Sequence, residues 1–155
     1  MENSFLIIWD VFNLGLVAFL WWMTLRHYND LPQRIPIHFS ISGKPDRFGD
    51  KVFTFLTPVL GLLLYAVFMY ITRHPENTNF PVSITENNRE AQYQIMKVYL
   101  RCLFVLIMLV FMNIQEYTFR YSRDGSAKPR VPVFISVLVI LASVLIMLAI
   151  SNSLK

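Results

Sequence analysis

The chain has 155 residues, of which 55% are hydrophobic and only 15% are charged. Soluble domains average about 45–50% apolar and about 25% charged residues, so this composition excludes a disordered chain and a disulfide-rich secreted module. The formal net charge of +4 comes from basic residues scattered between apolar runs. That pattern is typical of a protein embedded in a lipid bilayer and disfavours nucleic acid as a partner.

Four apolar runs of about 20 residues are each long enough to cross the hydrocarbon layer of a membrane. Because lipid offers the backbone no hydrogen-bond partners, each run should be a helix. The second and fourth runs carry no charge and no polar stripe, which favours membrane spans over the helices of a soluble bundle. The predicted fold is all-α and polytopic, a single domain over residues 1–155 with spans at 5–24, 52–71, 95–114 and 131–150.

Basic residues predict the orientation of the four spans. The first and third connecting loops carry nine Lys and Arg residues, whereas the middle loop and the end of the chain carry four. The positive-inside rule therefore places both termini outside the cytoplasm and the first and third loops within it.

The second run contains a proline near its start, Pro58. Proline has no backbone N–H, so the carbonyl of Thr54, four residues earlier, loses its helical partner. We expect a kink that serves packing rather than a gate.

The first loop is the most structured segment outside the spans. Its apolar residues alternate with Pro36, His38, Ser40 and Ser42 at a period of two, which is typical of an extended segment with one apolar face. The alternating apolar residues are Ile35, Ile37, Phe39 and Ile41. We expect an edge strand or an unpaired stretch whose apolar face presses on the bundle or on the lipid interface, followed by a turn at Gly43.

This loop resembles a bacterial membrane domain of unknown function that forms the N-terminal half of SdpI-type immunity proteins, which protect a cell against its own peptide toxin. The matching residues are Leu31, Pro32, Ile35, Pro36, His38, Phe39, Gly43, Pro45, Asp46, Phe48, Gly49 and Lys51. A weaker match covers residues 84–88 and 91–93, before the third span. The resemblance implies a bacterial inner (plasma) membrane protein. It also implies a binding role for Pro36, His38, Phe39, Gly43, Pro45, Asp46 and Lys51.

No motif indicates a metal, a cofactor or a catalytic residue. His27 and His38 are eleven residues apart, which matches no familiar ligand spacing, and the topology places His74 on the opposite side of the membrane. We expect His38 to brace the loop by hydrogen bonding to a nearby carbonyl or to Asp46, in preference to acting as a base.

Charged residues inside the spans suggest an intramembrane pair. Asp10 and Arg101 lie at similar depth, because the N-terminus and the middle loop share one side of the membrane. A pair between them would lower the cost of burying either charge, with Lys97 as a second partner and Asn13 adding a hydrogen bond. In the alternative, the cations reach the headgroups separately and Asp10 is protonated.

Small residues recur every seven positions in the fourth span, at Ser136 and Ser143 and at Ala142 and Ala149. Such residues let helices approach closely in lipid. The seam is either internal to the bundle or the contact of a homodimer through this helix.

Two functions are compatible with these features. The first is a non-enzymatic, immunity-like or sensing protein that binds a membrane-active peptide or a partner membrane protein. The second is a small membrane enzyme or transporter subunit that uses His38, Asp46 and the Asp10–Arg101 pair. The small number of convergent ionisable residues favours the first.

Overall fold

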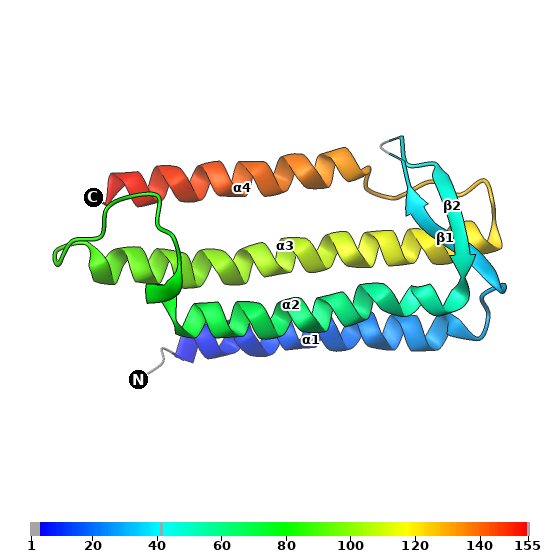
Figure 1. Cartoon of the computed structure of the whole chain (residues 1–155), viewed down its shortest axis with the longest axis horizontal. Helices are drawn as coiled ribbons and strands as arrows, with labels where there is room; N and C mark the ends of the chain where they lie inside the picture. Colours follow the sequence, from blue (N-terminus) through cyan, green and yellow to red (C-terminus); the bar gives the residue numbers. More distant parts are fainter. Residues whose placement is uncertain (1–3, 41, 155) are drawn as a thin grey trace.

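The computed structural model describes residues 4–40 and 42–154, which form four long helices and one β-hairpin (Figure 1). The hairpin lies between the first two helices, in the loop where the sequence predicted an extended segment followed by a turn. The elements are α1 (Ser4–Tyr28), β1 (Arg34–Phe39), β2 (Pro45–Asp50), the 3-10 helix η1 (Lys51–Phe55), α2 (Leu56–Arg73), the 3-10 helix η2 (Pro75–Asn77), α3 (Arg89–Arg123) and α4 (Val133–Ser153).

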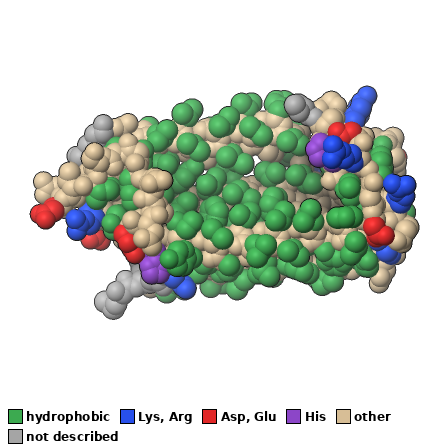
Figure 2. All heavy atoms as spheres, in the orientation of Figure 1, with side chains coloured by type: hydrophobic (Ala, Val, Ile, Leu, Met, Phe, Trp, Pro, Cys, Tyr) green, Lys and Arg blue, Asp and Glu red, His purple; other side chains and the backbone are tan. Residues whose placement is uncertain are grey.

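The helices run side by side with alternating direction (Figure 1). The start of α1, the end of α4 and the α2–α3 connection lie at one end of the bundle, and the hairpin and the α3–α4 loop lie at the other. Apolar side chains cover the middle of the visible face, and charged side chains gather at both ends (Figure 2). All four helices are long and apolar enough to cross a bilayer, so the chain is a multi-pass membrane protein.

The helices extend beyond the predicted spans. The third is the clearest correction, because it runs over 35 residues instead of the predicted 95–114. Its start is set by Thr85 and Asn88: the Asn88 side chain accepts from the Thr85 amide, and the Thr85 hydroxyl accepts from the Asn88 amide. At 1.5 Å per residue α3 is about 52 Å long, which exceeds the hydrocarbon thickness, so its ends project from the membrane. The second span begins as η1, and α4 begins two residues and ends three residues later than predicted.

Helix α3 is the centre of the bundle. It packs against α1, α2 and α4, whereas α4 packs mainly against α3. The core between α1, α2 and α3 is closed by Leu20, Phe104 and Met108, whose side chains are fully buried. The side chains of α4 are largely exposed around most of its circumference, as expected of a helix whose apolar surface faces lipid.

Two polar contacts fasten α4 to α3. At one end, Gln92 donates to the carbonyl of Ser151 over 2.9 Å and accepts from the Ser151 hydroxyl. Toward the other end, the Asn113 side chain donates to the Val131 carbonyl over 2.8 Å and accepts from the Val131 amide over 3.2 Å. The weaker sequence match therefore includes a residue, Gln92, that joins two helices.

The serines and alanines of α4 lie on different faces. Ser136 and Ser143 are half-buried on the side toward α3, and Ser136 lines a groove between the two helices. Ala142 and Ala149 are exposed. A homodimer through α4 remains a prediction, in which Ala142 and Ala149 are the small residues at the contact between the two copies.

The backbone carbonyl of Thr54, which cannot accept a hydrogen bond from Pro58, accepts one from a side chain of another helix. Pro58 lies in the first turn of α2, and Gln115 of α3 donates to the Thr54 carbonyl over 3.0 Å and to the Thr54 hydroxyl over 2.8 Å. The same amide group contacts the Thr24 hydroxyl of α1 at 2.9 Å. All three partners are buried, so one side chain joins α1, η1 and α3.

Replacing Gln115 by leucine should lower the free energy of unfolding by about 1–3 kcal/mol, because the Thr54 carbonyl is left buried without a donor. In a Pro58→Ala background the backbone amide at position 58 can donate to the Thr54 carbonyl. Gln115→Leu should then lower the free energy of unfolding by less. Denaturant titration in detergent micelles measures both values. Thr118→Val is the control, since that hydroxyl bonds only within its own helix. Equal costs in the two backgrounds would contradict this account.

Candidate functional site

The hairpin is held against the bundle at its tip. The predicted turn is present: Gly43 has a φ of 77°, a conformation that glycine adopts without strain. The Gly43 carbonyl accepts a 2.7 Å hydrogen bond from the Tyr117 hydroxyl of α3. The Phe39 ring lies 4.6 Å from the Tyr117 ring, measured between centroids. Strand β1, which lies against α3, thus fixes the position of the hairpin.

The apolar residues of β1 differ in burial. The pairing register shifts between Pro36 and His38, so Ile37 has no partner on β2. Ile35 is buried as expected, but Ile37 is 43% exposed. Ile41 lies outside the described residues. The shift interrupts the ladder at Ile37, whose side chain lies beside Gly49, the partner of Ile35, with part of its surface exposed.

Ile37 forms an exposed apolar patch together with Gly49 and Phe53. A Cβ atom at Gly49 would lie 2.9 Å from Ile37 and 3.4 Å from Phe53, so glycine is needed for both side chains to cover this position. Phe53 is 51% exposed. We call these three residues the hairpin patch. It lies where the hairpin meets the start of the second candidate span, Lys51–Arg73.

The polar motif residues of the hairpin face outward. His38 Nδ1 lies 2.6 Å from Asp46 Oδ1 across the two strands, with both side chains about half exposed. This contact agrees with the bracing role expected for His38. The Lys51 ammonium lies 4.7 Å from the centre of the Tyr28 ring, and Pro36 is buried opposite Phe48.

A cavity of about 740 Å³ lies between the tip of the hairpin and the α3–α4 loop. Its walls come from the tip (residues 42–45), the end of α3 (Tyr117 and Tyr121), the loop and the first residues of α4. Of the predicted binding residues, Gly43 and Pro45 line this cavity. Pro36, His38, Phe39, Asp46 and Lys51 do not, and the contacts above show that they shape and hold the hairpin.

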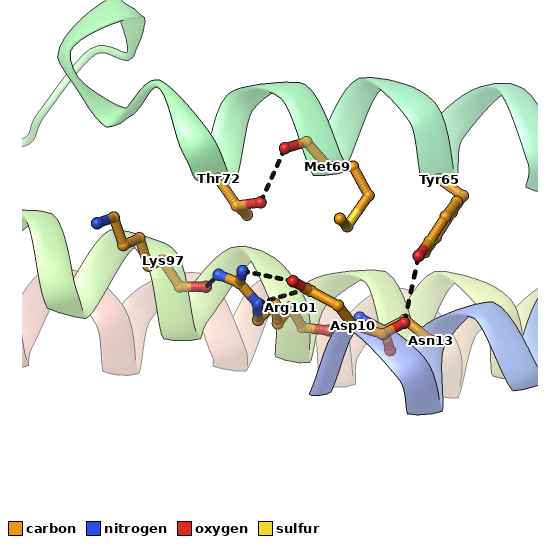
Figure 3. A network of polar contacts seen from close by, with 7 residues as sticks. All are labelled: Asp10, Asn13, Tyr65, Met69, Thr72, Lys97 and Arg101. Carbon is orange, nitrogen blue, oxygen red and sulfur yellow. Dashed lines mark hydrogen bonds and ion pairs between the residues drawn. The ribbon is translucent and has the colours of Figure 1, made fainter. Parts of the chain in front are cut away.

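A second polar site lies inside the membrane at the opposite end of the bundle (Figure 3). Arg101 of α3 donates from Nε to Asp10 Oδ1 over 2.7 Å and from Nη2 to Asp10 Oδ2 over 2.9 Å. The two side chains are 2% and 11% exposed. The structure thus brings together the two charges that the sequence placed at similar depth, in the bidentate geometry that suits arginine and carboxylate.

The surrounding residues complete most of this network. Asn13 Nδ2 donates to the Arg101 carbonyl over 3.3 Å, and the Tyr65 hydroxyl of α2 donates to the Asp10 carbonyl over 3.3 Å. Asn13 Oδ1 is buried and has no hydrogen-bond partner among the residues that the structure describes. The space among these side chains is about 10 Å³, which is close to the volume that holds one water molecule.

The Lys97 ammonium is not the second partner of Asp10 that the sequence predicted. Its backbone carbonyl accepts from Arg101 Nη1 over 3.0 Å, while its ammonium points away from Asp10 (Figure 3). A flexible four-carbon side chain one turn nearer the helix end can reach toward the headgroups, so it need not share the buried carboxylate.

Sequence reasoning missed Tyr117, Gln115, Gln92 and Asn113, the α3 residues that hold the hairpin and α4. Gln115 could have been found, since Pro58 leaves a carbonyl that needs a donor. A glutamine next to an apolar span is a suitable candidate. Tyr117 carried no comparable signal, because tyrosine is common at membrane surfaces.

Two comparisons with known proteins match part of the chain. Residues 15–62, from the middle of α1 through the hairpin into α2, match a family model described as a domain of unknown function, DUF1648. Over 77 residues the chain is 34% identical to an uncharacterized protein of Archaeoglobus fulgidus. That match covers 44% of this chain and 42% of the archaeal protein, so the chain spans less than half the length of this relative. No solved structure matches the chain significantly.

Gly43→Val should lower the folded yield and destabilise the protein by at least about 1–2 kcal/mol, because a β-branched residue resists a positive φ. The added side chain would also meet Pro129, 3.3 Å from the Cβ position. Gly125→Val is the matched control, since that loop glycine has open space around it and no positive φ. Size-exclusion chromatography and denaturant titration measure the effect, and equal losses for both variants would refute the explanation.

Asp10→Ala and Arg101→Ala should each destabilise the bundle by about 3–5 kcal/mol, because each leaves a buried charge without its partner. The double variant should lose less than the sum of the two. Lys97→Ala removes only an ammonium outside the network and should change the free energy of unfolding by less than about 0.5 kcal/mol. Strictly additive losses would mean that the two charges do not interact.

Proposed function

We propose that this chain is a non-enzymatic, immunity-like membrane protein that binds a membrane-active peptide through its hairpin patch. The observation that carries the proposal is the exposure of Ile37. An apolar side chain on a strand gains stability by burial, yet Ile37, at the register shift in β1, keeps 43% of its surface exposed. An exposed apolar group on a well-anchored element is a common feature of interaction sites.

The rigidity of the hairpin supports this role. The tip is bonded to Tyr117, and the segment that follows β2 is bonded to Gln115. The Asp50 side chain accepts from the Val52 amide over 3.0 Å and from Gln33 over 2.8 Å, which fixes the junction of the hairpin and η1. A preformed surface loses little conformational entropy when it binds.

The level of the patch in the membrane favours a peptide as the partner. Ile37 and Phe53 sit beside the start of the second span, where an amphipathic peptide lies when it enters a bilayer. We place the chain in the bacterial inner membrane with both termini extracytoplasmic, which puts the hairpin on the cytoplasmic side. A toxin made by the cell itself first meets the membrane on that side, in keeping with the resemblance of the loop to SdpI-type immunity proteins.

An enzyme or transporter subunit is less well supported. The groups assigned to such a role, the His38–Asp46 pair and the Asp10–Arg101 pair, lie at opposite ends of the bundle. His38 is not among the residues lining the hairpin cavity, and the space at Asp10 and Arg101 is about the size of one water molecule. These positions offer no single pocket in which the four side chains could act on one substrate.

Deleting the gene should sensitise the source cell to membrane-active peptides expressed in its cytoplasm, measured as loss of membrane potential. Wild-type protein should restore resistance, whereas Ile37→Ser and Phe53→Ser should each fail to restore it at equal membrane abundance. Leu154→Ser is the control, because that leucine is 46% exposed at the opposite end of the bundle. Full resistance with both patch variants would contradict the proposal.

A further inference from the structure

We propose that the hairpin cavity binds the headgroup of an anionic phospholipid, with one acyl chain in the groove between α3 and α4. This site is separate from the hairpin patch and does not depend on the peptide-binding role. The argument rests on the charges that line the cavity, on the apolar groove beside it, and on its level in the membrane.

The cavity has two cations that the fold does not use. Lys44 of the hairpin tip and Lys128 of the α3–α4 loop both line it. Within residues 4–40 and 42–154, no carboxylate forms an ion pair with either ammonium. The neighbouring carboxylates are occupied: Glu116 lies beside Arg120 and Arg130, and Asp124 accepts from Ser126.

Polar groups suited to a phosphodiester accompany these lysines. Ser42, Ser126 and Tyr121 also line the cavity. The Ser126 hydroxyl donates to Asp124 and the Ser42 hydroxyl is bonded to Ser40, which leaves the Tyr121 hydroxyl as the donor for a ligand. Hydroxyl groups and ammonium groups are the donors that phosphate oxygens take in proteins. A cationic ligand would instead meet two uncompensated positive charges, so the charge of the cavity selects an anion.

An apolar groove of about 170 Å³ begins one helical turn deeper in the bundle. On α3 the cavity reaches Tyr117, and the groove starts at Asn113 and continues to Leu106; Val139 and Ile140 line it on α4. Figure 2 shows openings between the apolar side chains of α4 and those of the helix beside it. An acyl chain fits such a strip, because methylene groups replace contacts that the two helices do not make with each other.

The cavity lies at the end of the bundle where the spans leave the membrane, beside Tyr117 and Tyr121. Tyrosine rings favour the headgroup region of a bilayer. A charged cavity at this level that opens onto an apolar groove matches a phospholipid, whose phosphate and acyl chains have the same order along the membrane normal. A free phosphate would leave the groove without a role.

The test is a lipid titration followed by native mass spectrometry of the full chain in detergent. Dioleoylphosphatidylglycerol should bind as one copy that survives mild activation, and dioleoylphosphatidylcholine, which has the same chains without net charge, should bind more weakly. Each basic residue near an anionic headgroup contributes a few-fold to affinity, so Lys44→Gln with Lys128→Gln should weaken phosphatidylglycerol binding about thirtyfold. Binding of phosphatidylcholine should change little in that variant.

Two further variants separate this site from general attraction. Arg34→Gln with Arg47→Gln removes the same charge from the hairpin without touching the cavity, and it should retain phosphatidylglycerol binding. Ser136→Phe, which fills the groove, should weaken both lipids. Equal losses for the lysine pair and the arginine pair would overturn the proposal, as would equal binding of the two lipids to the wild-type chain. A normal lipid result with failed peptide protection would count against the hairpin patch alone.

Discussion

The absence of water inside a bilayer is the constraint on which this structure depends. A polar group placed there must find its partner within the protein, and α3 supplies most of those partners. Arg101 reaches Asp10 of α1, Gln115 reaches Thr24 of α1 and Thr54 of η1, and Gln92 reaches Ser151 of α4. Apolar packing gives little selectivity in lipid, because the lipid tails are as apolar as leucine. These polar contacts therefore add selectivity to the apolar packing of the helices.

The same helix connects the buried network with the surface that we propose to be functional. Its length carries α3 past the hydrocarbon layer, so that Tyr117 can hold the tip of the hairpin. The hairpin then leaves Ile37 partly exposed, and it leaves a cavity between its tip and the α3–α4 loop. A loosely attached hairpin would offer neither a fixed patch nor a cavity of defined shape.

The fold was more predictable than the details of its sites. Run length and the lack of charge predicted four spans, and depth matching predicted that Asp10 and Arg101 would meet, because both depend on one-dimensional position. Period-two reasoning predicted the apolar face of β1, but it could not detect the register shift at Ile37, which arises from pairing with β2. Lys97 was placed wrongly because sequence gives the depth of a residue but not the direction of its side chain. Tyr117 and Gln92 act through contacts with distant segments, which no local pattern records.

The most direct test of this account is NMR spectroscopy of the Arg101 guanidinium in lipid nanodiscs. If Arg101 is bonded to Asp10 in a dry interior, its Nε–Hε proton should exchange slowly with water and give a resolved signal at neutral pH. Asp10→Asn should shift that signal, and Asp46→Asn, at the far end of the bundle, should leave it unchanged. Rapid exchange in the wild-type protein, or a signal indifferent to Asp10→Asn, would contradict the claim that α3 joins the helices through buried polar contacts.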